Sequence, residues 1–259
     1  HWVPSERILR TNLWSAELAK LTANAFLAQR ISSINTIAAL CEASGAHINE
    51  VVQAIGVDHR IGHNFLRAGP GFGGSCFQKD ILSLVYISQY FGLSDVASYW
   101  RSVITINDWS RRRITQLIIK NLFTTLRGKK LVILGFAFKP DTNDIRESPA
   151  INICQGLLDE GAILSIHDPM VSRDLLYQVL CCHEAANISF NQDLISSFRD
   201  ADAAVLLTEW PIYLKLDWQL LSTLMRSPAW IFDTRNVLNR VEIENFGLNL
   251  WSIGYGGIH

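Results

Sequence analysis

The chain has 259 residues, of which 49% are hydrophobic and 18% are charged, and its formal net charge is −1. This length can bury a large core in one or two domains, and the near-neutral charge gives no indication of a nucleic-acid surface or a membrane-binding patch. The sequence has no run of about 18 apolar residues, so it predicts no transmembrane helix, and its N-terminus does not have the pattern of a signal peptide.

The first half of the sequence predicts helices almost throughout. Apolar residues recur at helical spacing and glycines interrupt the pattern, with Gly45 ending the first long run. The expected helices cover residues 13–44, 47–55, 76–91 and 95–126. The basic run Arg111-Arg112-Arg113 is expected on a solvated face of the last helix. We therefore expect an all-helical central domain over residues 1–127.

From Gly128 onward, short apolar runs alternate with helical patterns. The expected strands cover residues 131–138, 162–167, 187–190, 203–207 and 229–233, with a short one near Trp251. The expected helices cover residues 148–160, 173–181, 192–199 and 217–225. This alternation predicts a doubly wound, Rossmann-like parallel sheet over residues 128–259, which makes the whole chain an α/β protein.

Ligands of such a sheet bind at the carboxyl ends of its strands. The segment 138–148 follows the first strand and carries Lys139 and Arg146, which are available for phosphate groups. The Gly-x-Gly-x-x-Gly fingerprint of dinucleotide-binding domains is absent there, because Gly135 is followed by Phe136, Ala137 and Phe138. The sequence thus predicts a nucleotide-domain shape without the dinucleotide signature.

The most informative segment, residues 69–80, reads Gly-Pro-Gly-Phe-Gly-Gly-Ser-Cys-Phe-Gln-Lys-Asp. Gly71, Gly73 and Gly74 permit unusual backbone angles and leave amide groups uncovered for a ligand. The spacing Ser75-x-x-Gln78 predicts a capping box, which places Cys76 in the first turn of a helix, where the dipole favours a thiolate. Two interpretations of Cys76 stay open at this point: a nucleophile beside an anionic substrate, and a buried packing cysteine.

Three further polar residues interrupt helical segments near this cysteine in the expected fold. Lys20 and Asn24 are four residues apart on one face of the long helix, and Asp80 is four residues after Cys76. Together with a cysteine they suffice for thiol chemistry on a carbonyl group, although Lys20 and Asn24 could equally be solvated or capping groups. Spacing alone does not show that the two helices meet.

The five cysteines at positions 41, 76, 154, 181 and 182 form an odd set without Cys-x-x-Cys spacing. Such a set is typical of reduced thiols in a cytoplasmic protein. We expect Cys41 and Cys154 in the core and Cys181 and Cys182 in structural positions. The seven histidines show no metal-ligand spacing, so no metal site is predicted.

Six blocks of the sequence, in order, carry a family resemblance. They are residues 20–35, 71–80, 135–139, 144–148, 208–210 and 232–236. Together they resemble the UDP-glucose 6-dehydrogenases of the UDP-glucose/GDP-mannose dehydrogenase family. The resemblance implies oxidation of UDP-glucose to UDP-glucuronate with two NAD, through a cysteine thiohemiacetal and thioester.

The resemblance also implies a role for each matching residue. Cys76 would capture the aldehyde, and Lys20 would stabilise charge on the C6 oxygen or assist proton transfer. Asp80 would orient the hydrolytic water, and Asn24 would contact the substrate and the oxyanion. The residues implied in substrate binding are Arg60, Phe65, Arg67, Gly71, Phe72, Gly73, Phe77, Phe138, Lys139 and Arg235. Arg146 would approach the NAD pyrophosphate, and Arg60 would reach the sugar site of the neighbouring subunit of a homodimer built through the long helix.

One feature of the family is missing from these 259 residues: the N-terminal NAD-binding domain with its Gly-x-Gly-x-x-Gly. We therefore expect a fragment or a truncated product that binds UDP-sugar weakly at most and does not turn over alone. The alternatives are another UDP- or GDP-sugar dehydrogenase, and a non-catalytic module for UDP-sugar binding and dimerisation.

Overall fold

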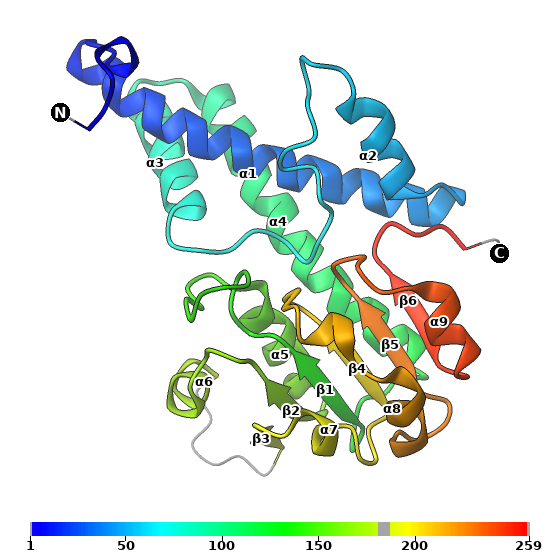
Figure 1. The fold of residues 1–259 in the computed structure, drawn as a ribbon. Coiled ribbons are helices and arrows are strands. Elements are labelled where there is room, and N and C mark those ends of the chain that lie inside the picture. The colour runs from blue at the N-terminus through cyan, green and yellow to red at the C-terminus, as the bar shows by residue number, and fades with distance from the viewer. Residues whose placement is uncertain (1, 181–186, 258–259) are drawn as a thin grey trace.

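The computed structural model describes residues 2–180 and 187–257. Figure 1 shows a helical part, crossed by one long helix, that lies against one end of a sheet flanked by helices. The fourth helix runs from the helical part down along the sheet, so it joins the two. This arrangement confirms the predicted α/β fold of a helical region followed by a parallel sheet.

The helical part consists of a 3₁₀ turn, η1, and four α-helices. Their bounds are η1 Ser5–Arg7, α1 Leu13–Ser44, α2 Ile48–Gly56, α3 Phe77–Tyr90 and α4 Ser94–Asn121. The side chain of Asn12 caps α1 by accepting a hydrogen bond from Ser15 N, and Gly45 ends the helix with a φ of 82°. Ala25 and Ala28 on α1 are fully buried, and such small side chains let α3 and α4 approach the helix closely.

The sheet has six parallel strands in the order β3-β2-β1-β4-β5-β6. The strands are β1 Lys130–Leu134, β2 Ile163–His167, β3 Ile188–Phe190, β4 Ala203–Leu206, β5 Trp230–Asp233 and β6 Asn249–Ser252. The helices around them are α5 Pro149–Asp159, α6 Arg173–Val179, α7 Leu194–Ser197, α8 Trp218–Leu224 and α9 Arg240–Asn245, with the 3₁₀ turn η2 at Tyr213–Lys215. The strand order reverses between β1 and β4, where doubly wound sheets bind ligands.

The largest core fills the space between the sheet and its helices, and α4 contributes to it. Ile114, Ile118 and Leu122 of α4 pack in the same cluster as the strand residues. The expected domain boundary between residues 127 and 128 falls in the turn between α4 and β1, and it stays a prediction. Within the described residues, no helix is long and apolar enough to cross a membrane.

Several expectations about local structure need correction. The first strand ends at Leu134 rather than at residue 138, because Gly135 turns the chain with a φ of 91°. The last helix of the first half ends at Asn121 rather than at residue 126, because Phe123 and Thr124 adopt left-handed angles. Helix α9 and the two 3₁₀ turns were not predicted.

The expected solvated face of α4 was wrong for Arg111, which is 4% exposed, whereas Arg112 is exposed as predicted. Cys41 and Cys154 are buried as expected, and burial raises the pKa of the Cys154 thiol far above its usual range. Cys181 and Cys182 lie outside the described residues.

Candidate functional site

The two helices that carry the predicted polar residues meet. Lys20 and Asn24 lie one turn apart on α1, and both point at Asp80 in the first turn of α3. The Lys20 Nζ atom donates to both carboxylate oxygens of Asp80, at 2.9 and 2.7 Å, and Asn24 Nδ2 donates to Oδ2 at 2.5 Å. The structure thus joins two neighbouring residues of α1 to a carboxylate that lies 60 and 56 positions later in the sequence.

Burial and charge set the protonation of this cluster. The side chain of Asp80 is 2% exposed and that of Lys20 is 57% exposed. Burial alone would raise the pKa of Asp80, but the hydrogen bonds from Lys20 and Asn24 outweigh it and hold that pKa below its usual value. The hydrogen bond to Asp80 likewise raises the pKa of Lys20. At neutral pH the cluster is therefore a carboxylate beside an ammonium group whose other side faces solvent.

Cys76 occupies the N-cap position of α3, and its carbonyl accepts the first helical hydrogen bond, from Asp80 N at 2.9 Å. The predicted capping box was wrong: no side chain caps this helix, and Ser75 Oγ instead lies 3.6 Å from Cys76 Sγ. The helix begins at Phe77, so Cys76 precedes the first turn rather than lying within it. The interpretation as a buried packing cysteine was also wrong, because Cys76 is exposed.

The glycines before Cys76 are required for two different reasons. Gly71 and Gly74 have φ values of 126° and 84°, which other residues rarely adopt. Gly73 has no such angle, contrary to expectation, and is needed for space: a Cβ atom there would lie 2.6 Å from the carbonyl oxygen of Glu147. The loop is thus pressed against the segment that follows β1.

Substituting Gly73 by alanine should therefore force the two segments apart. We expect a loss of about 1–3 kcal/mol in the free energy of unfolding, as for other overpacked sites, measured by urea denaturation. Gly257→Ala is the matched control, since a Cβ atom there would meet nothing within 4 Å. Equal stability of the two variants would contradict this reason for the glycine.

Positive side chains gather where the sheet meets the glycine loop. Arg235, just after β5, donates from Nε to Leu207 O at 2.7 Å and pairs with Glu209 at 3.1 Å. Burial lowers the pKa of Arg235, and the nearby charge of Arg67 lowers it further. After β1, the ring of Phe138 lies beside Gly74, and Lys139 Nζ lies 5.4 Å from the centre of that ring. These cations surround the carboxyl end of the sheet, where an anionic ligand is favoured.

The three predicted phenylalanines of the helical part form one aromatic group. The Phe77 ring lies 6.4 Å from that of Phe65 and 5.8 Å from that of Phe72. Phe65 is 42% exposed and has a left-handed φ of 60°, whereas Phe72 is buried in the helical core. Phe72 thus supports the loop with its ring, while Phe65 remains accessible to a ligand.

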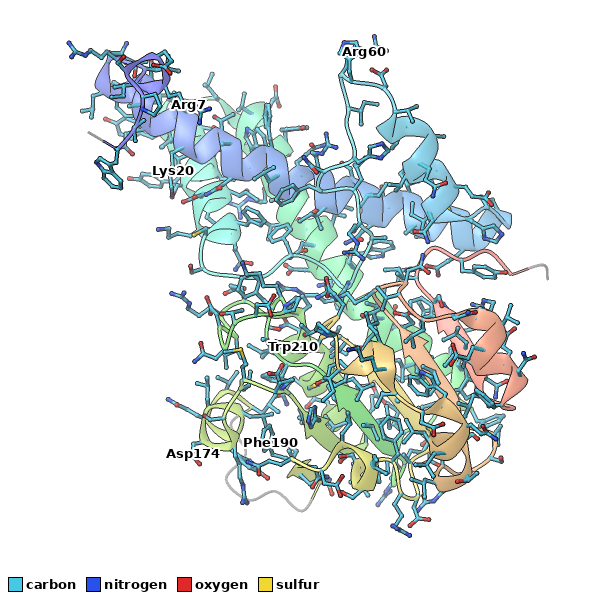
Figure 2. The ribbon with its side chains drawn as sticks, viewed as in Figure 1. Arg7, Lys20, Arg60, Asp174, Phe190 and Trp210 are labelled. Carbon is cyan, nitrogen blue, oxygen red and sulfur yellow. The ribbon has the colours of Figure 1, made fainter. Side chains whose placement is uncertain are left out.

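Two predicted arginines pair within their own loops. Arg60 pairs with Asp58 at 2.6 Å at the tip of the segment after α2, which points away from Lys20 in Figure 2. The chain therefore does not bring Arg60 to its own cysteine. Arg146 pairs with Asp144 at 2.7 Å, and the Arg146 carbonyl accepts a hydrogen bond from Gly74 N at 2.8 Å. The hydrogen bond to Asp144 raises the pKa of Arg146, and Cys76 makes a smaller contribution in the same direction.

Sequence reasoning missed three buried residues that hold the glycine loop. Asn35 Oδ1 accepts from Gly69 N at 2.9 Å, and Asn107 binds both peptide groups of Phe72. Arg111 donates to Phe72 O and Glu147 O. Their signal in the sequence was present: polar residues at the apolar spacing of long helices.

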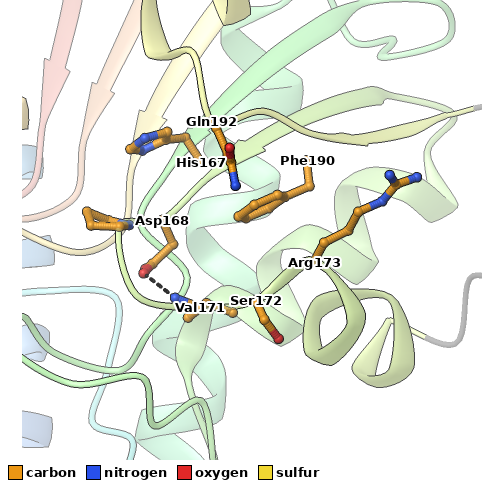
Figure 3. A pocket seen from close by; sticks show the side chains of 8 residues that line it. His167, Asp168, Val171, Ser172, Arg173, Phe190 and Gln192 are labelled. Carbon is orange, nitrogen blue, oxygen red and sulfur yellow. Dashed lines mark hydrogen bonds between the residues drawn. The ribbon is translucent and has the colours of Figure 1, made fainter.

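A separate cavity of about 640 Å³ lies at the carboxyl ends of β2 and β3 (Figure 3). Its lining includes Asp168, whose carboxylate accepts hydrogen bonds from the backbone amides of Phe136, Ala137, Met170 and Val171. Trp210 Nε1 donates to the same carboxylate at 3.2 Å. Both carboxylate oxygens of Asp168 therefore serve to hold the loops after β1 and β2 in place. The described residues contain no group of three His, Cys, Asp or Glu side chains that could hold a metal ion.

Comparison with known proteins gives matches in both parts of the chain. Residues 14–109 match the central-domain model of the UDP-glucose/GDP-mannose dehydrogenase family, and residues 132–240 match its UDP-binding-domain model. A UDP-glucose 6-dehydrogenase from Oryza sativa subsp. japonica and one from Arabidopsis thaliana are each 48% identical over 98% of this chain and 56% of their own length. The chain therefore spans about half the length of these relatives.

Solved structures agree with the sequence matches. A UDP-glucose dehydrogenase from Pyrobaculum islandicum is 30% identical, with a TM-score of 0.78 over 94% of this chain and 51% of the other. An NDP-N-acetyl-D-galactosaminuronic acid dehydrogenase from Methanosarcina mazei is 27% identical, with the same TM-score and coverage. The fold, the sequence blocks and both domain matches show that this chain belongs to the UDP-glucose/GDP-mannose dehydrogenase family, of which it contains the central and UDP-binding domains.

Proposed function

We propose that this chain is the UDP-sugar-binding and thiol-bearing part of a UDP-glucose 6-dehydrogenase, which oxidises UDP-glucose to UDP-glucuronate with two NAD. The observation that carries the proposal is an exposed cysteine at the start of α3, one helical turn before Asp80, whose buried carboxylate is bound by Lys20 and Asn24. A thiol near an ammonium group and an amide suits capture of a carbonyl compound. The names of the relatives support the substrate.

The chemistry of this part starts with the thiolate of Cys76. Its sulfur forms a bond to C6 of the sugar aldehyde, and the carbonyl oxygen takes up a proton, which gives a thiohemiacetal. Lys20 can donate to that oxygen, because two of its three N–H bonds serve Asp80 and leave the third for a ligand. Asn24 is fixed by Asp80, and the carboxylate of Asp80 can orient the water that later hydrolyses a thioester.

The nucleotide end of the substrate would meet the positive side chains at the sheet. Arg67, Arg235 and Lys139 can contact the diphosphate, and Phe138 can pack against the sugar or the base. Gly71 and Gly73 keep the loop free of side chains, so that its backbone can approach the ligand. Phe65 and Phe77 complete this side of the site.

The residues of the sheet do not fit a dinucleotide. The turn after β1 has the single glycine Gly135, which packs against Thr208. After β2, both carboxylate oxygens of Asp168 already accept hydrogen bonds from backbone amides. In the described part of the chain, the turn after β1 does not form a phosphate cradle, and the loop after β2 offers no free ribose-binding carboxylate. We therefore propose that the hydride acceptor is not held by this sheet, and that Arg146 of the segment after β1 contacts its pyrophosphate.

The assembly and location are proposals as well. Large apolar side chains on α1 are exposed, among them Leu13, Trp14, Phe26 and Leu40. Such a surface supports a homodimer through α1, in which Arg60 reaches the sugar site of the neighbouring subunit. The cysteines that the structure describes, Cys41, Cys76 and Cys154, are unpaired, which supports a cytoplasmic location.

Calorimetric titration of the chain with UDP-glucose, UDP-N-acetylmannosamine and GDP-mannose tests the substrate. We expect measurable binding only for the UDP-sugars, with UDP-glucose the tightest. NADH formation in full-length protein with each sugar tests the reaction. A preference for an acetamido sugar would indicate that the chain belongs to another UDP-sugar dehydrogenase. Binding of UDP-sugar without turnover by the full-length protein would favour a non-catalytic binding module.

A further inference from the structure

Arg111 of α4 is a deeply buried charged side chain that lies behind the glycine loop. Its side chain is 5% exposed. One terminal nitrogen, Nη2, donates to Phe72 O at 2.9 Å and to Glu147 O at 3.0 Å, and the other, Nη1, donates to Asn152 Oδ1 at 2.9 Å. A single guanidinium from α4 thus bridges the glycine loop, the segment after β1 and the helix α5.

Asn107 completes this bridge one turn earlier on α4. Its Oδ1 accepts from Phe72 N at 2.8 Å, and its Nδ2 donates to Phe72 O at 3.2 Å. Gly71 has a φ of 126°, an angle that residues with a side chain rarely adopt. A Cβ atom at this position would also lie 2.6 Å from Asn107 Oδ1, so only glycine fits beside Asn107. The peptide groups of Phe72 are therefore fixed from both sides.

The segment that contains Arg146 and Glu147 is held to the same loop. Gly73 lies against Glu147 O, and Gly74 N donates to Arg146 O. Glu147 has a left-handed φ of 53°, which is an unfavourable angle for a residue with a side chain. The bond from Arg111 to the Glu147 carbonyl helps to hold this unfavourable conformation.

We propose that Arg111 is a positioning residue, which with Asn107 clamps the glycine loop to the Arg146–Glu147 segment and so fixes Cys76 relative to Arg146. This inference rests on the proposed function of Cys76 as the nucleophile. Cys76 follows Gly74 by only two residues, and Gly74 N is bonded to Arg146 O at 2.8 Å, so the clamp sets the backbone positions of both the thiol-bearing loop and Arg146. Lysine cannot replace Arg111, because an ammonium group lacks the planar fork that reaches two carbonyls and an amide at once.

The test compares Arg111→Lys with the control Arg112→Lys, which keeps the same net charge at the exposed neighbouring arginine. In the folded chain, Cys76 is alkylated with anionic iodoacetate and with neutral iodoacetamide, and the ratio of the two rates is measured by peptide mass spectrometry. This ratio reports positive charge near the sulfur. We expect it to fall about threefold in Arg111→Lys, as for the loss of roughly 0.7 kcal/mol of charge interaction, and to stay unchanged in Arg112→Lys.

Hydrogen exchange gives the second readout. Amides of residues 72–74 should exchange at least tenfold faster in Arg111→Lys, while those of α1 should keep the wild-type rate. Asn107→Ala, which removes half of the clamp without burying an unpaired charge, should show a smaller change of the same kind if Arg111→Lys does not fold. Unchanged exchange and an unchanged rate ratio in a folded variant would overturn the proposal. If both readouts change as expected but the chain binds no UDP-sugar, the clamp stands and the proposed function fails.

Discussion

Replacing Cys76 by serine should abolish turnover of UDP-glucose in the full-length enzyme while leaving UDP-glucose binding within about twofold. The hydroxyl of serine is a far weaker nucleophile than a thiolate at neutral pH, so we expect kcat to fall by at least about 10³-fold. The substitution removes one exposed sulfur and no packing contact of the core, so the melting temperature should not change. The measurements are NADH formation, calorimetric binding and thermal denaturation.

Cys41→Ala is the matched control for this experiment. Cys41 is buried in the cluster that joins α1 to the end of the sheet, far from any proposed chemistry. The Cys41→Ala variant should have a lower free energy of unfolding than wild type but the same kcat per folded molecule. If kcat of the Cys76→Ser enzyme stayed within tenfold of wild type, the reaction would not proceed through a thiohemiacetal on Cys76.

Replacing Asp80 by asparagine should affect both catalysis and stability. The variant keeps the shape of the side chain but loses the charge that pairs with Lys20 and fixes Asn24. We expect kcat to fall about 10²-fold, a typical loss when a group that orients water or a proton is removed. At pH 7 we expect a loss of about 1–3 kcal/mol in the free energy of unfolding, because a buried charge-assisted network is broken.

The loss in stability should depend on pH in one direction. The native pKa of Asp80 lies below its ordinary value of 3.8, so the unfolded chain binds more protons between the two pKa values. Asp80 therefore stabilises the fold fully above its unfolded pKa, and this contribution is lost as the pH falls through the native pKa. The difference between wild type and Asp80→Asn should accordingly be constant from pH 5 to 7 and shrink below about pH 4.

Urea denaturation at a series of pH values measures this difference. Asp95→Asn is the control, since Asp95 also lies in the first turn of a helix but is exposed. Its effect should not exceed a few tenths of a kcal/mol. If the effect of Asp80→Asn stayed constant down to pH 3, the carboxylate would not be held by the Lys20 and Asn24 hydrogen bonds.

Much of the fold follows from local patterns in the sequence. The spacing of Leu21, Ala25 and Ala28 predicted the long helix, and Gly45 marked its end, because these signals act within a few turns. The strands β1 to β5 were predicted by short apolar runs for the same reason. Boundaries failed where the chain makes tertiary contacts, as at Gly135, where the carboxylate of Asp168 captures the following amides and ends the strand.

For the site, the sequence could predict which residue types are involved and which of them share one face of a helix. The Lys20–Asn24 pair and the distance from Cys76 to Asp80 could be read from spacing, but not the contact between α1 and α3. The position of Arg111 at apolar helical spacing indicated burial, but its role could not be read from the sequence, since its partners lie on two loops that are 39 and 36 residues away. The capping box at Ser75 failed because the bonding of its hydroxyl depends on the conformation of the loop and not on the motif.

The most direct test of the account is addition of UDP-glucose 6-aldehyde, labelled with ¹³C at C6, to the chain itself. Capture needs no oxidant, because the S–H bond of Cys76 adds across the carbonyl group. The ¹³C spectrum should show a new saturated carbon bonded to sulfur and oxygen in the wild-type chain, and this signal should be absent in Cys76→Ser. A spectrum with only free and hydrated aldehyde, at ligand concentrations that saturate UDP-sugar binding, would contradict the claim that Cys76 captures the aldehyde.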